Sequence, residues 1–208
     1  EIAHIVRAGI ERMYGGQHPD PNVMYYLTVY NEPIVQPAEP EGVDVDGIVR
    51  GIHRISTGEG DGARAQLLAS GVGVPWAKEA QQLLRDDWGV AADVWSVTSW
   101  TELRRDGLAA DEHNFLHPEE ELAGAPGPVI AVSDFMHAVQ DQIRPWVQHD
   151  FYTLGADGFG FSDTRAAARR FFKIDGPSIV VRALQALAQQ GAVDRSLVAQ
   201  AIEKYRLF

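Results

Sequence analysis

The sequence predicts an α/β fold in which a mostly parallel β-sheet is covered by helices on both faces. From Gly47 onward, short apolar runs rich in β-branched residues alternate with amphipathic runs of helical period. This alternation is typical of βαβ units. The chain has 208 residues, of which 45% are hydrophobic, and this is enough for one sizeable buried core.

Five runs have the character of strands, and they cover residues 48–55, 63–69, 92–98, 128–133 and 151–154. Helical spacing is present in residues 74–88, 100–106, 136–147 (interrupted around Pro145), 164–172, 178–189 and 196–207. We expect residues 63–69 and 92–98 to be central strands of the sheet.

The first 46 residues follow a different pattern. Residues 1–14 have apolar side chains at helical spacing, and residues 23–30 (V-M-Y-Y-L-T-V-Y) have strong strand character. Because one helix and one strand cannot form a core, we expect residues 1–30 to be the end of a preceding domain in a longer polypeptide. Residues 31–46 contain three prolines and no periodicity, which predicts an interdomain linker. Residues 47–208 then form the main domain.

The stretch 151–172 is the best candidate for a functional loop. An apolar run ends at Leu154, glycines follow within residues 155–160, and a helix starts near Thr164. In open α/β sheets, loops at the carboxyl ends of strands carry binding sites. The polar side chains of this loop belong to Asp157, Ser162, Asp163 and Arg165. They can form a site, but the residue types alone favour a structural role, with Ser162 or Asp163 capping the helix.

Composition excludes several function classes. The chain has 29 acidic and 18 basic residues, a formal net charge of −11, and no basic stripe, so we expect no nucleic-acid partner. No apolar run approaches the roughly 18 residues that span a bilayer, so we expect no membrane segment. Cysteine is absent, which excludes disulfides and thiolate chemistry and fits a reducing, cytoplasmic location.

One histidine pair is better explained as structural than as a metal site. His113 and His117 are four residues apart, but Pro118 follows directly, and no glutamate stands between them as in a zinc-protease motif.

A glycine pair resembles a dinucleotide-binding turn only superficially. Gly71 and Gly73 lie between a predicted strand and a predicted helix, and Asp93 follows about twenty residues later, as a ribose-binding acid would. Trp76, however, occupies the place of the third glycine. We therefore expect the two glycines simply to permit a tight turn.

Seven stretches of the sequence resemble one enzyme family. In chain order they are E-R-M-Y-G (11–15), Y-Y-L-T-V-Y-N-E (25–32), P-E-G (40–42), S-V-T-S-W-T-E-L-R-R-D-G (96–107), N-F-L-H-P (114–118), L-G-A-D-G-F-G-F-S-D-T-R (154–165) and A-I-E-K-Y (201–205). Together they are similar to the C-terminal end of the homodimeric, thiamine-dependent pyruvate dehydrogenases, the decarboxylating first components of pyruvate dehydrogenase complexes. The stretches are in order and cover nearly the whole chain.

The resemblance implies a three-layer, transketolase-type C-terminal domain from about residue 47, preceded in residues 1–30 by the end of a pyrimidine-binding domain. It also implies that the D-x-F-G-x-S loop faces the other domains and the dimer partner near the active-site region. The candidate interface residues are then Asp157, Phe159, Ser162, Asp163 and Arg165.

The resemblance further implies that the chemistry lies elsewhere in the parent enzyme. In the family, thiamine diphosphate and Mg²⁺ are held by a G-D-G motif far upstream, and the glutamate that activates the cofactor is upstream as well. We therefore expect no catalytic, cofactor-binding or metal-binding residue within these 208 residues.

The parent enzyme implied by the resemblance decarboxylates pyruvate and acetylates the lipoyl group of the dihydrolipoyl acyltransferase component. This part of it would be structural, contribute to the homodimer interface and be inactive alone. One alternative remains, a free-standing module that binds a small anion at residues 155–165 with the help of Arg165. Another 2-oxo acid dehydrogenase would share the fold, but T-E-L-R-R-D-G and N-F-L-H-P point to the pyruvate enzymes.

Overall fold

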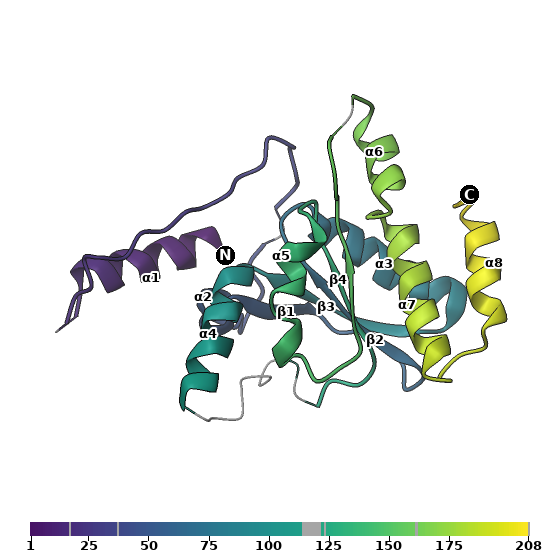
Figure 1. The fold of residues 1–208 in the computed structure, drawn as a ribbon, viewed down its shortest axis with the longest axis horizontal. Coiled ribbons are helices and arrows are strands. Elements are labelled where there is room, and N and C mark those ends of the chain that lie inside the picture. The colour runs from purple at the N-terminus through teal and green to yellow at the C-terminus, as the bar shows by residue number, and fades with distance from the viewer. Residues whose placement is uncertain (17, 37, 114–121, 123, 161, 208) are drawn as a thin grey trace.

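The structure is a computed structural model that describes residues 1–208 except 17, 37, 114–121, 123, 161 and 208 (Figure 1). Its elements follow in the order α1 (Ile2–Tyr14), α2 (Val45–Arg50), β1 (Ile52–Ser56), β2 (Arg64–Ala69), α3 (Gly73–Trp88), β3 (Ala91–Val97), α4 (Trp100–His113), β4 (Val129–Val132), α5 (His137–Asp141), the 3₁₀-helix η1 (Arg144–Trp146), β5 (Phe151–Leu154), α6 (Arg165–Phe172), α7 (Gly176–Gln189) and α8 (Ser196–Lys204). Among the described residues, no helix is long and apolar enough to cross a membrane.

The strands form one sheet in the order β1-β3-β2-β4-β5. β2 pairs in parallel with β3 and β4, and β4 pairs in parallel with β5, whereas the edge strand β1 is antiparallel to β3. The prediction of a mostly parallel sheet is confirmed. The runs 63–69 and 92–98 are interior strands, as expected.

Helices cover both faces of the sheet, α3 and α7 on one face and α4 and α5 on the other (Figure 1). Successive side chains of β2 pack on opposite faces of the sheet. Leu67 packs into the core cluster that includes Leu84 of α3 and Leu184 of α7, while Leu68 packs into the cluster that includes Trp100 of α4. This alternation follows from the pleat of a strand, whose side chains point to opposite faces in turn.

The strand predicted for residues 23–30 is wrong. These residues are extended, but no strand pairing is assigned to them, and Met24, Tyr26 and Val29 are 91%, 90% and 79% exposed. A strand is stabilised by hydrogen bonds to a neighbouring strand and by side-chain packing. The part of the chain that the structure describes supplies no such neighbour for this segment. The predicted helix in residues 1–14 is confirmed as α1.

The strand predicted for residues 48–55 is only partly correct, because its first half is the end of helix α2. The Asp44 side chain caps this helix by accepting a hydrogen bond from the Gly47 backbone N–H at 2.9 Å. Gly51 ends it with a φ of 115°, which favours glycine. The strand β1 then starts at Ile52.

The helix predicted for residues 100–106 continues to His113, through Gly107. Gly107 does not end the helix but lets the Trp146 side chain pack closely against it, since a Cβ at Gly107 would lie 2.7 Å from Cε2 of Trp146. The remaining predicted strands and helices from residue 63 onward are confirmed to within a few residues, although the run 136–147 divides into the short helix α5 and η1.

Candidate functional site

The sheet has a topological switch point between β2 and β4. The chain leaves the carboxyl end of β2 toward α3 on one face, and it leaves the carboxyl end of β4 toward α5 on the other. Diverging loops of this kind open a crevice at the edge of an open α/β sheet, and this crevice is where such folds bind ligands. Gly71 follows β2 and Asp134 follows β4, so these two residues define the switch point.

The switch point is occupied by the side chain of Tyr30, from the N-terminal segment. The Tyr30 hydroxyl donates a hydrogen bond to Asp134 Oδ1 at 3.0 Å. The phenol lies directly against Gly71, where an added Cβ would be 2.5 Å from the Tyr30 hydroxyl oxygen. Burial, and then the charge of Asp134, raise the pKa of the Tyr30 phenol above its usual range. The phenol therefore keeps its proton and remains a donor.

Residues 30–34 lie along this edge as an extended segment with one face toward the domain. Tyr30, Glu32 and Ile34 are partly buried, and the residues between them are exposed. Tyr30 and Ile34 pack against the core cluster that contains α3 and α7. This period of two is that of an extended chain lying on a surface.

Glu32 is the second polar anchor of this segment. Its carboxylate accepts a hydrogen bond from Arg169 and lies 3.7 Å from Nε of Arg165, both on α6. The Arg169 guanidinium in turn lies 4.8 Å from the ring centroid of Trp76 on α3, a cation–π geometry. Residues 30–34 are thus tied to α3, α6 and the loop after β4.

The loop between β5 and α6 rises away from the sheet (Figure 1). Asp157 Oδ1 accepts a hydrogen bond from the His137 backbone N–H at 2.9 Å, which supports the first residue of α5. Phe159 is 99% exposed. Ser162 and Asp163 are exposed as well. The structure does not bring the predicted residues of this loop into one cluster.

The predicted helix cap at Ser162 or Asp163 is wrong by one or two residues. Thr164 is the N-cap residue of α6, and its hydroxyl accepts a hydrogen bond from the Ala167 backbone N–H at 3.3 Å. Asp163 instead accepts from the adjacent Thr164 N–H at 2.6 Å. Sequence does not distinguish three consecutive capping residues, because all three side chains can accept such a bond.

An anion at this helix start would compete with a carboxylate that is already present. Arg165 faces Glu32 at 3.7 Å, so part of its charge is compensated within the chain. This contact offers no support for the alternative of a free-standing anion-binding module.

Several of the described histidines make side-chain contacts within the chain. His137 Nδ1 lies 2.9 Å from Thr153 Oγ1, and His53 Nε2 lies 2.7 Å from Glu1 Oε1. His117 lies outside the described residues, as does the side chain of His113. Within the described ranges, no group of three or more His, Cys, Asp or Glu side chains could hold a metal ion.

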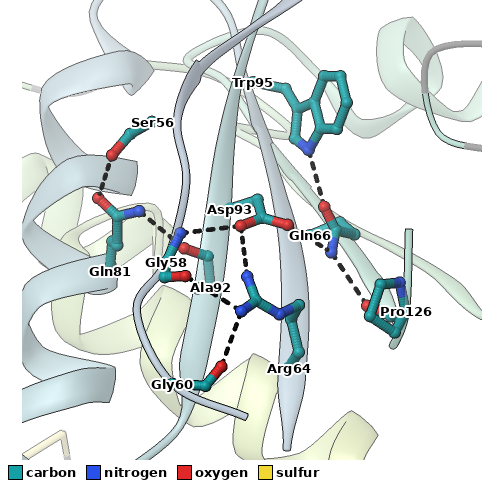
Figure 2. A network of polar contacts seen from close by, with 10 residues as sticks. All are labelled: Ser56, Gly58, Gly60, Arg64, Gln66, Gln81, Ala92, Asp93, Trp95 and Pro126. Atoms are coloured by element: carbon teal, nitrogen blue, oxygen red, sulfur yellow. Dashed lines mark hydrogen bonds and ion pairs between the residues drawn. The ribbon is translucent and has the colours of Figure 1, made fainter.

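Asp93 belongs to a buried structural network near the amino ends of β2 and β3, away from the switch point at their carboxyl ends (Figure 2). Its Oδ1 accepts hydrogen bonds from Arg64 Nη1 at 2.6 Å and from the Gly58 backbone N–H at 2.8 Å. Gln66, fully buried, donates to Asp93 Oδ2 and to the Pro126 carbonyl, and accepts from the Trp95 indole. Asp93 therefore fastens the 57–62 loop to the sheet and does not face the turn at Gly71, which favours our structural interpretation of that turn.

Sequence reasoning missed Tyr30, Glu32 and Asp134. One usable signal was the even spacing of the apolar residues Tyr30 and Ile34, which places both on one face of an extended segment. A second signal was the polar pair Ser133 and Asp134 after the apolar run 129–132.

The α/β fold described above agrees with comparisons with known proteins. The family described as "Transketolase-like TK C-terminal domain" matches residues 51–175. The chain therefore belongs to the family of transketolase-like C-terminal domains.

The relatives most informative about this chain are pyruvate dehydrogenase E1 components. The chain is 54% identical over 217 residues to that of Mycolicibacterium smegmatis and 42% identical over 215 residues to that of Escherichia coli K12. Both alignments include 100% of this chain but only 23% and 24% of the relatives. The chain thus spans less than a third of the length of these relatives.

Solved structures support the fold. A transketolase from Leishmania mexicana matches with a TM-score of 0.51 and 18% identity, and one from Pichia stipitis with 0.50 and 22%. Each match covers 72% of this chain and 20% of the transketolase chain.

Proposed function

We propose that this chain is the carboxyl-terminal part of a pyruvate dehydrogenase E1 component. The whole enzyme would decarboxylate pyruvate and pass the acetyl group to the lipoyl group of the dihydrolipoyl acyltransferase component. The observation that carries the proposal is the 54% identity to an E1 component over the full length of this chain. A cytoplasmic location would follow, and the lack of cysteine fits such a reducing compartment.

In this proposal thiamine diphosphate and Mg²⁺ bind upstream of residue 1, and they supply the decarboxylation chemistry. The described residues do not fit a diphosphate–Mg²⁺ site. The Asp157 carboxylate, next to Gly158, is engaged by the His137 N–H, and the described part of the chain holds no cluster of three potential metal ligands. The role of this part is then to support and position the catalytic domains.

Residues 1–30 would belong to the preceding pyrimidine-binding domain, and residues 31–46 would link it to the C-terminal domain. Exposed apolar side chains support this division. Ile2, Ile10 and Tyr14 of α1 are 54%, 53% and 77% exposed, and large apolar surface of this kind marks a face that packs against something else.

The loop 155–165 would face the other domains or the dimer partner of the whole enzyme. Phe159 supports this role, because it is 99% exposed on a loop that stands off the body of the domain. Aromatic side chains are enriched in the buried centre of protein interfaces. Asp157, Ser162, Asp163 and Arg165 would form the polar surroundings of that anchor.

A chimaeric enzyme tests the proposed identity. In the E1 component of Mycolicibacterium smegmatis, the aligned segment is replaced by these 208 residues. We expect the chimaera to dimerise and to decarboxylate pyruvate at a rate comparable with that of the parent, whereas a version that lacks the segment is inactive. A folded chimaera that binds thiamine diphosphate but does not turn over pyruvate would contradict the proposal.

Titration calorimetry tests the assignment of the cofactor to upstream domains. Thiamine diphosphate with Mg²⁺ is titrated into this 208-residue chain, with the intact Mycolicibacterium enzyme as the positive control. We expect heat of binding only for the intact enzyme. Saturable binding to the 208-residue chain would mean that a cofactor site lies within it.

The interface role of the loop is tested in the same chimaera. We expect Phe159→Ser to weaken the dimer in sedimentation velocity experiments, while Phe171→Ser, a change at an exposed phenylalanine on α6, leaves it intact. Equal dimerisation of the two variants would remove the loop from the interface.

A further inference from the structure

The position at which an open α/β sheet binds its ligands holds a side chain of this chain itself. We propose that the switch point between β2 and β4 is a binding site for a phenol, that Tyr30 is its intramolecular ligand, and that the bound phenol holds residues 30–34 as a strap across the carboxyl edge of the sheet. This inference concerns a site within the chain and does not rest on the proposed function.

The polar end of the site recognises a hydroxyl group. Asp134 Oδ1 accepts the Tyr30 hydroxyl at 3.0 Å, and hydrogen bonds to charged acceptors are stronger than those between neutral groups. Asp134 stands directly after β4 and is partly buried, so its position is set by the sheet and not by the strap. A ring without a hydroxyl would leave this carboxylate without the hydrogen bond that the phenol donates.

The floor of the site is shaped by the lack of a side chain. Gly71 has a φ of +53°, and a Cβ there would lie 2.5 Å from the Tyr30 hydroxyl oxygen. Any residue other than glycine would therefore clash with the phenol, and its backbone would also be strained at this φ. The ring also belongs to the partly buried shell around the α3–α7 core cluster, which supplies the apolar contact that a phenol requires.

A second anchor keeps the strap in place two residues further along. Glu32 is held by Arg169, whose guanidinium stacks on Trp76. Because this anchor is independent of Tyr30, we expect Glu32 to stay bound to α6 when the phenol is removed, while the backbone around residue 30 loosens. The vacated site should then be open to a small molecule.

Calorimetric titration of p-cresol into the Tyr30→Ala variant is the direct test. We expect saturable binding together with a rise in melting temperature, and no binding to the unchanged chain, whose site is filled. Tyr26→Ala is the matched control, because Tyr26 lies in the same segment but is 90% exposed. This variant should not bind p-cresol.

Specificity for the hydroxyl group is tested with toluene, which lacks it, and with the substitution Asp134→Ala. Toluene should bind the Tyr30→Ala variant about tenfold more weakly than p-cresol does. In the double variant with Asp134→Ala, the affinity for p-cresol should fall by a similar factor, as expected for the loss of a hydrogen bond to a charged acceptor. The proposal would be overturned if the two compounds bound equally well or if p-cresol bound the unchanged chain. It would also be overturned if a folded Tyr30→Ala variant did not bind p-cresol.

A double-mutant cycle with Gly71→Ala gives a readout that does not depend on an added ligand. If the Tyr30 phenol lies on Gly71, the methyl group should displace it and raise deuterium uptake in residues 30–34. The loss of melting temperature from Gly71→Ala should then be smaller in the Tyr30→Ala background, where only backbone strain remains. Strictly additive effects, with unchanged uptake in the strap, would show that Tyr30 does not occupy the site.

Discussion

Arg64 and Asp93 form an ion pair that is largely withdrawn from water, with side-chain exposures of 17% and 4%. Arg64 also donates to the carbonyl groups of Gly58 and Gly60 (Figure 2). Removing one partner of a buried pair leaves the other charge uncompensated, so we predict that Arg64→Ala lowers the free energy of unfolding by about 3–5 kcal/mol.

Urea denaturation measures this change, and Arg85→Ala is the control because Arg85 pairs with Asp86 on the exposed surface. The control should have little effect. Similar stabilities of the two variants would mean that the network in Figure 2 is not held by its ion pair.

Asp87 fastens the C-terminal helix to α3. Its carboxylate lies 2.6 Å from the Lys204 ammonium and accepts the Tyr205 hydroxyl at 2.7 Å. These two contacts hold the pKa of Asp87 below its usual range. A carboxylate whose pKa is lower in the folded state stabilises the fold above its unfolded pKa, and this contribution is lost as the pH falls through the folded pKa.

We therefore predict that Asp87→Asn lowers the free energy of unfolding at pH 7 by no more than about 1 kcal/mol, because solvent screens this partly exposed pair. The difference from the unchanged chain should shrink as the pH falls below about 4. Urea titrations at pH 7 and pH 3 measure it, with Glu203→Gln on the exposed face of α8 as the control. A difference that does not depend on pH would contradict the assignment.

At the scale of elements, β3 is enclosed along its whole length, since all seven of its residues are buried. Val94 is 0% exposed and lies between β1 and β2 in the sheet. We predict that Val94→Asp lowers the free energy of unfolding by about 4 kcal/mol or more, because it places a carboxyl group in an apolar core.

Val35→Asp is the matched control, since Val35 is 93% exposed. Chemical denaturation of both variants gives the comparison. A Val94→Asp variant that unfolds at the same denaturant concentration as the control would contradict the position of β3 inside the sheet.

Elements could be predicted from sequence where their periodicity is set by the core of their own domain. β2, α3 and β3 fall where the apolar spacing puts them, because both faces of these strands are buried. Residues 23–30 failed because strand propensity describes how a side chain suits a sheet and supplies no neighbouring strand. The helix α2 was missed because its six residues are too few for a visible period, and its signals were the cap at Asp44 and the glycine at residue 51.

The candidate site could be predicted only in part. The sequence shows that loops follow the carboxyl ends of strands, and this directed attention to the loop after β5. It does not show which strands are neighbours. The switch point lies between β2 and β4, 60 or more residues apart in the chain, so the meeting of Gly71, Asp134 and Tyr30 depends on the strand order.

At the scale of the whole molecule, the N-terminal arm and the domain should differ in stability. Residues 23–29 extend from the body with no strand pairing (Figure 1), whereas the backbone groups of β3 are bonded on both sides. We predict that the amides of residues 23–29 exchange with deuterium fastest and those of β3 slowest, close to the rate of global unfolding.

Hydrogen exchange followed by mass spectrometry measures both segments in one experiment, and residues 30–34 should lie between them. Slow exchange in residues 23–29 would mean that this arm pairs with another strand in solution. Its large apolar exposure would then be covered by a second copy of the chain.

The close contact between Gly71 and Tyr30 also has a consequence for sequence variation among relatives. A methyl group at position 71 would clash with the phenol of Tyr30. If position 30 holds a smaller residue, this clash disappears, and only the positive φ of residue 71 still favours glycine there. The two positions lie 41 residues apart in the chain, yet they should be inherited as a pair. Relatives that carry a side chain at position 71 should also have exchanged the tyrosine, and lineages that keep the tyrosine should keep the glycine.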